Sequence, residues 1–124
     1  RGKVLNVHPS LLPKYRGLHT YRRALDDGER WHGTSVHFVT ETLDGGPVIA
    51  QARVAIAPGD TEATLRERTQ RAEHALYPRV VAAVAHREAV LVNDETALWR
   101  SAPLVAPLAP EDLTAGQAQR AQGG

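Results

Sequence analysis

Three polar side chains are of the types that could transfer an acyl group to an amine. Asn6 and His8 occupy alternate positions at the end of a short aliphatic run, so in a strand they point to the same face. Asp44 lies in Leu-Asp-Gly-Gly-Pro, a turn whose backbone can approach a ligand closely. The Asn6 amide and a protonated His8 can donate hydrogen bonds to the oxyanion of a tetrahedral intermediate. A carboxylate, or water held by it, can accept the proton that the attacking amine loses.

The same residues also have ordinary structural explanations. A histidine after a strand is more often structural or solvated, and an aspartate before Gly-Gly is typical of turns. His37, on an alternating segment, reads most simply as a half-buried core residue. His8, His37 and Asp44 could instead form a two-histidine, one-carboxylate metal site. The sequence has no H-E-x-x-H pattern and no cysteine, so we favour chemistry without a metal.

Composition limits the class of protein. The chain has 124 residues, enough for one domain with one core, and its formal net charge is +1. This balance gives no electrostatic reason to expect nucleic-acid or membrane binding. No apolar run approaches the roughly 20 residues that a membrane helix needs. Without cysteine, disulfides and thiolate metal sites are excluded. We expect a cytoplasmic protein.

Five segments must position these side chains. A buried strand is predicted over 4–7, ending at His8-Pro9, and a loop over 10–17, which contains proline and glycine. A short helix is predicted from about 20 to 27. Alternating segments at 34–40 and 48–56 predict a hairpin whose turn carries the aspartate.

The second half of the chain predicts a long helix. Asp60 is the expected N-cap, and apolar residues recur at helical spacing after it. Pro78 is expected to kink or split this helix. A last strand is predicted at 89–92, with residues 98–99 pairing nearby. From residue 101 the chain is rich in Pro, Ala, Gln and Gly, which predicts a flexible tail.

The first predicted strand begins almost at the first residue. A buried strand needs neighbours on both sides, and the rest of the sequence offers few. The chain also starts at Arg1 and contains no methionine. We therefore expect a piece of a longer protein whose other part supplies more of the sheet. The open edge of such a sheet could pair with a second copy, which would give a homodimer or an edge-paired oligomer.

Several motifs resemble the formyltransferase superfamily. They run from Asn6 to Pro13 (Asn-Val-His-Pro-Ser-Leu-Leu-Pro), from His32 to Val39 and from Leu43 to Ile49, in the family's order and spacing. The resemblance implies that residues 1–100 form the C-terminal, catalytic segment of a Rossmann-like three-layer α/β fold. Such a segment has a sheet with a β-hairpin and a long helix, and residues 101–124 would follow as a flexible tail.

Details favour one branch of that family. His8-Pro9-Ser10 and Leu43 to Pro47 look like the enzymes that act on glycinamide ribonucleotide. Methionyl-tRNA formyltransferases and formyltetrahydrofolate hydrolases differ at both places and remain the alternatives. The resemblance implies transfer of formyl from the co-substrate 10-formyltetrahydrofolate to the amine of glycinamide ribonucleotide in purine synthesis, with no metal.

The resemblance also implies roles for individual residues. Asn6 and His8 would stabilise the oxyanion, while Asp44 would orient His8, hold a water and help to move the proton. Residues 10–31 would form a mobile lid that excludes water. The resemblance also assigns folate binding to Thr40, Glu41, Leu43 and Asp44. It assigns binding of the nucleotide substrate to Asn6, Pro9, Gln70 and Glu73. Ser35 and His37 would support the catalytic residues.

Two departures from the family matter. The sequence contains no glycine-rich loop of the kind that holds a substrate phosphate at a helix N-terminus. We therefore expect little formyl transfer from this chain by itself. Tyr21 stands where many relatives have histidine, so lid contacts are expected to differ.

Overall fold

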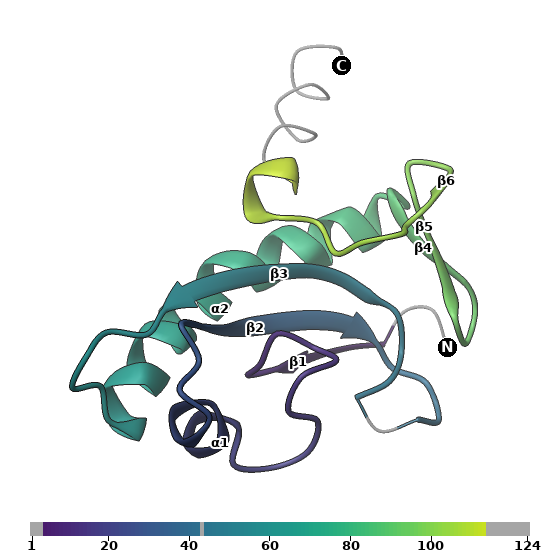
Figure 1. Cartoon of the computed structure of the whole chain (residues 1–124). Coiled ribbons are helices and arrows are strands. Elements are labelled where there is room, and N and C mark those ends of the chain that lie inside the picture. The colour runs from purple at the N-terminus through teal and green to yellow at the C-terminus, as the bar shows by residue number, and fades with distance from the viewer. Residues whose placement is uncertain (1–3, 43, 114–124) are drawn as a thin grey trace.

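A hairpin and one further strand form the sheet on which the candidate site is built (Figure 1). The computed structural model describes residues 4–42 and 44–113. In the sheet, β1 (Leu5–His8) pairs antiparallel with β2 (Trp31–Phe38), which pairs antiparallel with β3 (Val48–Ala55). The predicted hairpin is confirmed, and with it the expected α/β class with a β-hairpin and a long helix.

The first strand is less buried than we predicted. Val4 is 53% exposed, Asn6 is exposed, and Leu5 and Val7 are only partly buried. The reason is topological: β1 lies at the edge of the sheet, and β2 is its only neighbour among the described strands. The expectation of a buried strand at 4–7 is therefore wrong for this part of the chain, because burial on both sides requires a second neighbour.

The long helix α2 (Glu62–Ala85) runs without a break through Pro78, so the predicted split is wrong. Leu76 and Val80, on either side of the proline in sequence, are 1% and 0% exposed. Their packing holds both halves in place, so tertiary contacts offset the loss of one backbone donor. Within the described residues, no helix is both long and apolar enough to cross a membrane.

The start of α2 also differs from the prediction. Thr61, not Asp60, is the N-cap: its hydroxyl accepts from the Thr64 backbone N–H, and the Thr64 hydroxyl accepts from the Thr61 N–H. Asp60 instead binds the Arg68 guanidinium through both carboxylate oxygens and accepts from the Ala57 N–H at 2.7 Å. Its carboxylate therefore joins the turn before the helix to the helix's second turn.

The core lies between the sheet and α2, which crosses one face of it (Figure 1). Phe38, Ile49 and Val80 are fully buried there. The short helix α1 (Thr20–Asp26) packs at the other end, where Tyr21 meets Leu65 of α2 in a smaller cluster. These contacts fix the hairpin and thereby the residues at its turn.

The segment after α2 folds back on the core, although we expected a flexible tail from residue 101. A second antiparallel sheet comprises β4 (Ala89–Asn93), β5 (Thr96–Trp99) and β6 (Ala102–Pro103). Leu108 then forms a bridge with Ala50 of β3, and Leu113 is 1% exposed. A few scattered apolar residues are enough to hold this segment on the core, because the backbone of Leu108 also forms hydrogen bonds with the backbone of β3. The amino-acid composition does not reveal such bonds. Residues 114–124 of the expected tail lie outside the described residues.

The buried Leu113 side chain gives a test of this packing. Leu113→Ala should lower the free energy of unfolding by about 2–5 kcal/mol, because it removes buried carbon and leaves a cavity. Denaturant unfolding of the full chain measures this. The matched control is Val105→Ala on the same segment, where the side chain is 93% exposed and the expected change is within about 0.5 kcal/mol. Equal, small effects of the two substitutions would show that the segment is not packed in solution.

The Asp60–Arg68 pair predicts a pH-dependent stability. The hydrogen bonds from Arg68, followed by those from Ala57 and Thr64, hold the pKa of Asp60 well below its usual range. A carboxylate with a depressed folded-state pKa stabilises the fold above its unfolded pKa of about 3.9 and loses this contribution as the pH falls below it. The difference in unfolding free energy between the parent chain and Asp60→Asn should therefore be largest near neutral pH and shrink below about pH 4. A difference that stays constant from pH 7 to pH 3 would contradict this assignment.

Candidate active site

The Asp44 carboxylate lies between two buried histidine rings. Its Oδ2 is 3.4 Å from His8 Nδ1, and its Oδ1 is 3.7 Å from His37 Nε2. The Gly17 backbone N–H donates to Oδ2 at 3.0 Å. Asp44 is 9% exposed, so these neighbours provide most of its surroundings. The acid and the imidazole that were chosen from the sequence are thus in contact.

The turn between β2 and β3 places this carboxylate. Asp44 adopts a left-handed backbone with φ 49°, which aspartate tolerates better than most residues. The Gly45 N–H donates to the Thr42 carbonyl at 3.1 Å and closes the turn. A Cβ on Gly46 would lie 2.0 Å from the Phe38 carbonyl oxygen, so only glycine fits where the turn rejoins the hairpin. The Gly-Gly pair is therefore a steric requirement for the position of Asp44.

Four polar side chains share one face of the β1–β2 pair. Asn6 lies opposite His37, and His8 lies opposite Ser35. Directly opposed residues of antiparallel strands point to the same face, as do alternate residues along each strand. Asn6 is exposed and its Oδ1 accepts from the Val7 N–H, whereas His8 is 6% exposed. The sheet register thus brings Asn6 to the histidine pair.

His37 is more deeply buried than predicted, at 3% exposed rather than half-buried. Its Nδ1 is 2.9 Å from the Phe38 carbonyl oxygen, so Nδ1–H is the donor there. Its buried Nε2 has no hydrogen-bond partner among the described residues. In a neutral ring this nitrogen presents a lone pair toward the Asp44 carboxylate.

Ser35 and Gln51 hold the loop that follows β1. The Ser35 hydroxyl donates to the Ser10 carbonyl at 2.7 Å and accepts from the Leu12 N–H at 3.0 Å. The Gln51 side-chain amide donates to the Leu12 carbonyl at 2.9 Å and to Ser35 Oγ at 3.0 Å. Our sequence analysis missed Gln51, since an alternating strand residue gives no sign of a partner 39 positions away.

The remaining predicted site residues come from the hairpin turn, the loop after β1 and α2. Thr40 is partly buried and Glu41 exposed on the hairpin turn, while Leu43 lies outside the described residues. Pro9 directly follows His8. Its backbone makes a hydrogen bond with His32, a ring whose pKa is lowered by burial. Two further residues, on α2, have no hydrogen bond or ion pair to Asn6, His8 or Asp44 within the described structure: Gln70 and Glu73.

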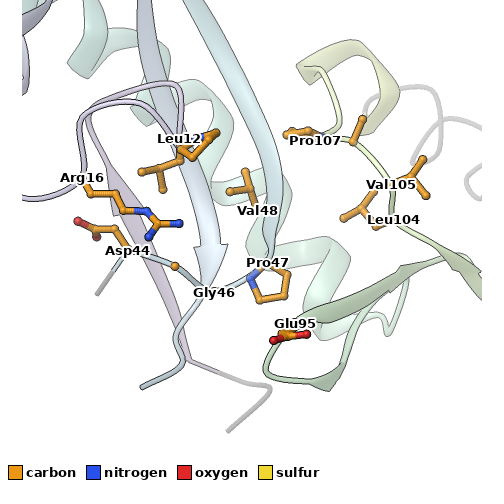
Figure 2. Close-up of a pocket in the computed structure, with 13 residues that line it drawn as sticks. Leu12, Arg16, Asp44, Gly46, Pro47, Val48, Glu95, Leu104, Val105 and Pro107 are labelled. Carbon is orange, nitrogen blue, oxygen red and sulfur yellow. The ribbon is translucent and has the colours of Figure 1, made fainter. Parts of the chain in front are cut away.

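A pocket of about 300 Å³ opens beside Asp44 (Figure 2). One wall comes from the hairpin turn and the loop after β1, with Arg16 near the aspartate. The opposite wall comes from Glu95 and the apolar segment 104–107. The volume is at the lower end of the range for small-molecule sites. Sequence analysis missed the apolar part of this wall because it assigned residues 104–107 to a tail.

The described residues do not support the alternative metal site. Across residues 4–42 and 44–113, no group of three His, Asp or Glu side chains is arranged to hold a metal ion. His8 and His37 approach different oxygens of the same carboxylate. The Asp44 carboxylate lies between two imidazoles, an arrangement that suits proton transfer and oxyanion stabilisation.

Known proteins share both the sequence and the fold. A family model described as "Formyl transferase" matches residues 1–81. The phosphoribosylglycinamide formyltransferase of Escherichia coli K12 is 55% identical over 98 residues, which are 79% of this chain and 45% of that protein. The chain thus spans less than half the length of this relative.

Solved structures agree. The phosphoribosylglycinamide formyltransferase of Coxiella burnetii, in complex with CHES, superposes with a TM-score of 0.80 at 46% identity, over 87% of this chain and 51% of that one. A formyltetrahydrofolate deformylase from Pseudomonas syringae superposes with a TM-score of 0.71 at 26% identity, over 77% of this chain and 32% of that one. The match over residues 1–81 covers more than half of the chain, and the chain therefore belongs to the formyl transferase family.

Proposed function

We propose that this chain carries the acyl-transfer residues of an enzyme that moves formyl from 10-formyltetrahydrofolate to the amine of glycinamide ribonucleotide, a step of purine synthesis. The observation that carries the proposal is the contact between His8 Nδ1 and the Asp44 carboxylate at 3.4 Å in a member of the formyl transferase family. His8 Nε2 lies 2.6 Å from a carbonyl oxygen, which can only accept, so Nε2 is the ring atom that can donate to a substrate.

The oxyanion is stabilised by His8 and Asn6. When the amine attacks the formyl carbon, negative charge develops on the formyl oxygen. His8 Nε2–H and the exposed Asn6 amide lie on one face of β1, and each can donate to that oxygen. Since the amine itself attacks, no side-chain nucleophile is required.

Asp44 accepts the proton that the attacking amine loses. The attacking amine becomes positively charged and must lose a proton before the tetrahedral intermediate collapses toward the product. Asp44 can accept it directly or through a water. His37 approaches the other carboxylate oxygen, at 3.7 Å, and acts as a positioning residue for Asp44. The bond between the formyl carbon and the folate nitrogen then breaks, and the proton passes from Asp44 to that leaving nitrogen.

Binding of the two substrates is proposed by family resemblance. The turn residues Thr40, Glu41, Leu43 and Asp44 would contact the pterin. Pro9 of the loop, together with Gln70 and Glu73 of α2, would contact the nucleotide, as would Asn6. Gln70 and Glu73 are three residues apart on the helix and so can act on the same ligand.

The catalytic proposal is tested in a hybrid enzyme. The aligned 98 residues of the Escherichia coli relative are replaced by those of this chain. Formyl transfer to glycinamide ribonucleotide is then measured, with free formate as a second readout. Asn6→Ala and His8→Ala should each lower kcat about 100- to 1000-fold, by removal of an oxyanion donor. Asp44→Asn should lower kcat about 100-fold or more, because the proton acceptor is lost.

Controls separate the roles from the fold. Glu67→Gln removes an exposed carboxylate that pairs with Arg71 on α2, and its turnover should match the unchanged hybrid. Asp44→Asn with unchanged kcat would show that the carboxylate is not the proton acceptor. If the active hybrid releases formate without formylating the amine, the chain belongs with the hydrolases instead.

A second candidate role, that of a non-catalytic module that pairs through its sheet edge, is favoured by the exposed edge of β1. Val4 is 53% exposed, and among the described strands only β2 pairs with β1. An open edge of this kind can add a strand from another molecule. Light scattering of the chain across concentrations should then show a homodimer or larger species, and Val4→Lys should shift it toward monomer. A monomer at every concentration would remove this alternative.

A further inference from the structure

The loop between β1 and α1, residues 9–19, lies across the candidate catalytic groups; we call it the strap. The Tyr15 carbonyl oxygen is 2.6 Å from His8 Nε2. The Gly17 backbone N–H donates to Asp44 Oδ2 at 3.0 Å. Both contacts are made by the strap's backbone, and each involves the atom that the proposed reaction would use.

The two backbone groups have the chemistry of the substrates. A carbonyl oxygen accepts from His8 Nε2–H, which is the contact that the formyl oxygen would need at about 2.7–3.1 Å. An N–H donates to the Asp44 carboxylate, as the attacking amine would. In this position of the strap, His8 Nε2 and Asp44 Oδ2 each have a backbone partner where a ligand atom would bind.

We propose that the strap is an internal pseudo-substrate, and that Tyr15 is the positioning residue whose side chain latches it over His8 and Asp44. The catalytic meaning of the blocked atoms rests on the proposed function. The latch itself is a statement about access to His8, and it can be tested without any turnover.

The Tyr15 side chain carries the latch. Its hydroxyl donates to Asp27 Oδ2 at 2.6 Å, just beyond α1. Desolvation and the Asp27 hydrogen bond raise the pKa of the Tyr15 hydroxyl above its ordinary range. The Arg23 guanidinium lies 5.1 Å from the Tyr15 ring centroid and donates to the Arg16 and Leu18 carbonyls. The tip of the strap is thus tied to α1.

The strap backbone is strained between its two attachments. Tyr15 and His19 have φ values of 56° and 61°, a left-handed conformation that is unfavourable for residues with a Cβ. The base of the strap is held by Ser35 and Gln51 through Leu12. Loss of the latch at the tip would therefore relieve strain while the base stays fixed, so the strap can leave His8 without unfolding.

Chemical modification of His8 measures this opening. The full chain is treated with diethyl pyrocarbonate at neutral pH, and the rate of carbethoxylation of each histidine is followed by peptide mass spectrometry. Tyr15→Phe keeps the ring and removes the hydroxyl. It should raise the rate at His8 about five- to tenfold, as expected for loss of one hydrogen bond. The rate at the exposed His86 should stay the same.

A double-mutant comparison identifies the bond. Asp27→Ala removes the other partner and should accelerate His8 to a similar extent, while the Tyr15→Phe/Asp27→Ala double variant should add little to either. Glu67→Gln, which breaks an exposed ion pair on α2, is the matched control and should change no histidine's rate. Thermal unfolding of each variant confirms that the fold is kept.

Two results would overturn the proposal. One is an unchanged rate at His8 in both single variants. The other is an equal acceleration at His8 and at the buried His32, which would indicate general loosening rather than release of a strap. The modification experiment needs no substrate. The latch proposal can therefore be contradicted while the hybrid still transfers formyl, and the latch can be supported while the hybrid is inactive.

Discussion

The position of one carboxylate organises the candidate site. Asp44 reaches both histidines only because its backbone is left-handed and because Gly46 lets the chain pass against the Phe38 carbonyl. The hairpin then fixes the distance between the turn and β2, and β1 is held in register beside it. A buried carboxylate without partners would carry a large desolvation cost. The Gly17 backbone N–H and the neighbouring His8 ring are thus a structural condition for the acid as well as a chemical one.

The same requirement explains why the strap lies where it does. Buried polar atoms need hydrogen-bond partners in every state of the molecule, including the state without substrate. His8 is 6% exposed and Asp44 9%, so water alone satisfies neither of them fully. The Tyr15 carbonyl and the Gly17 N–H supply those partners. A ligand that displaces them replaces one set of hydrogen bonds with another, so its net gain in binding is smaller than its contacts suggest.

The hairpin, the long helix and the candidate trio were predicted from local signals. Alternation along the strands, the Leu-Asp-Gly-Gly-Pro turn and helical spacing after Pro58 each depend on a few neighbouring residues. The errors fall where distant contacts decide. Pro78 lies inside an unbroken helix because Leu76 and Val80 are packed in the core. The segment after residue 101 folds back because Leu108 forms a bridge with Ala50 of β3. Gln51 and the backbone of Tyr15 have no local signature at all, since their partners are set by tertiary structure.

The site therefore combines two parts with different mechanical properties. The histidines and Ser35 stand on strands whose hydrogen bonds and buried core resist displacement, which suits groups that must hold a reacting geometry. The strap has left-handed backbone at Tyr15 and His19 and is attached by side-chain hydrogen bonds at Leu12 and Tyr15. Elements that move are drawn from the least stable parts of a fold. The strap covers the catalytic side chains through its backbone atoms. Substitutions in the strap can therefore alter access to His8, while the sheet and the hairpin turn continue to fix the distance between His8 and Asp44.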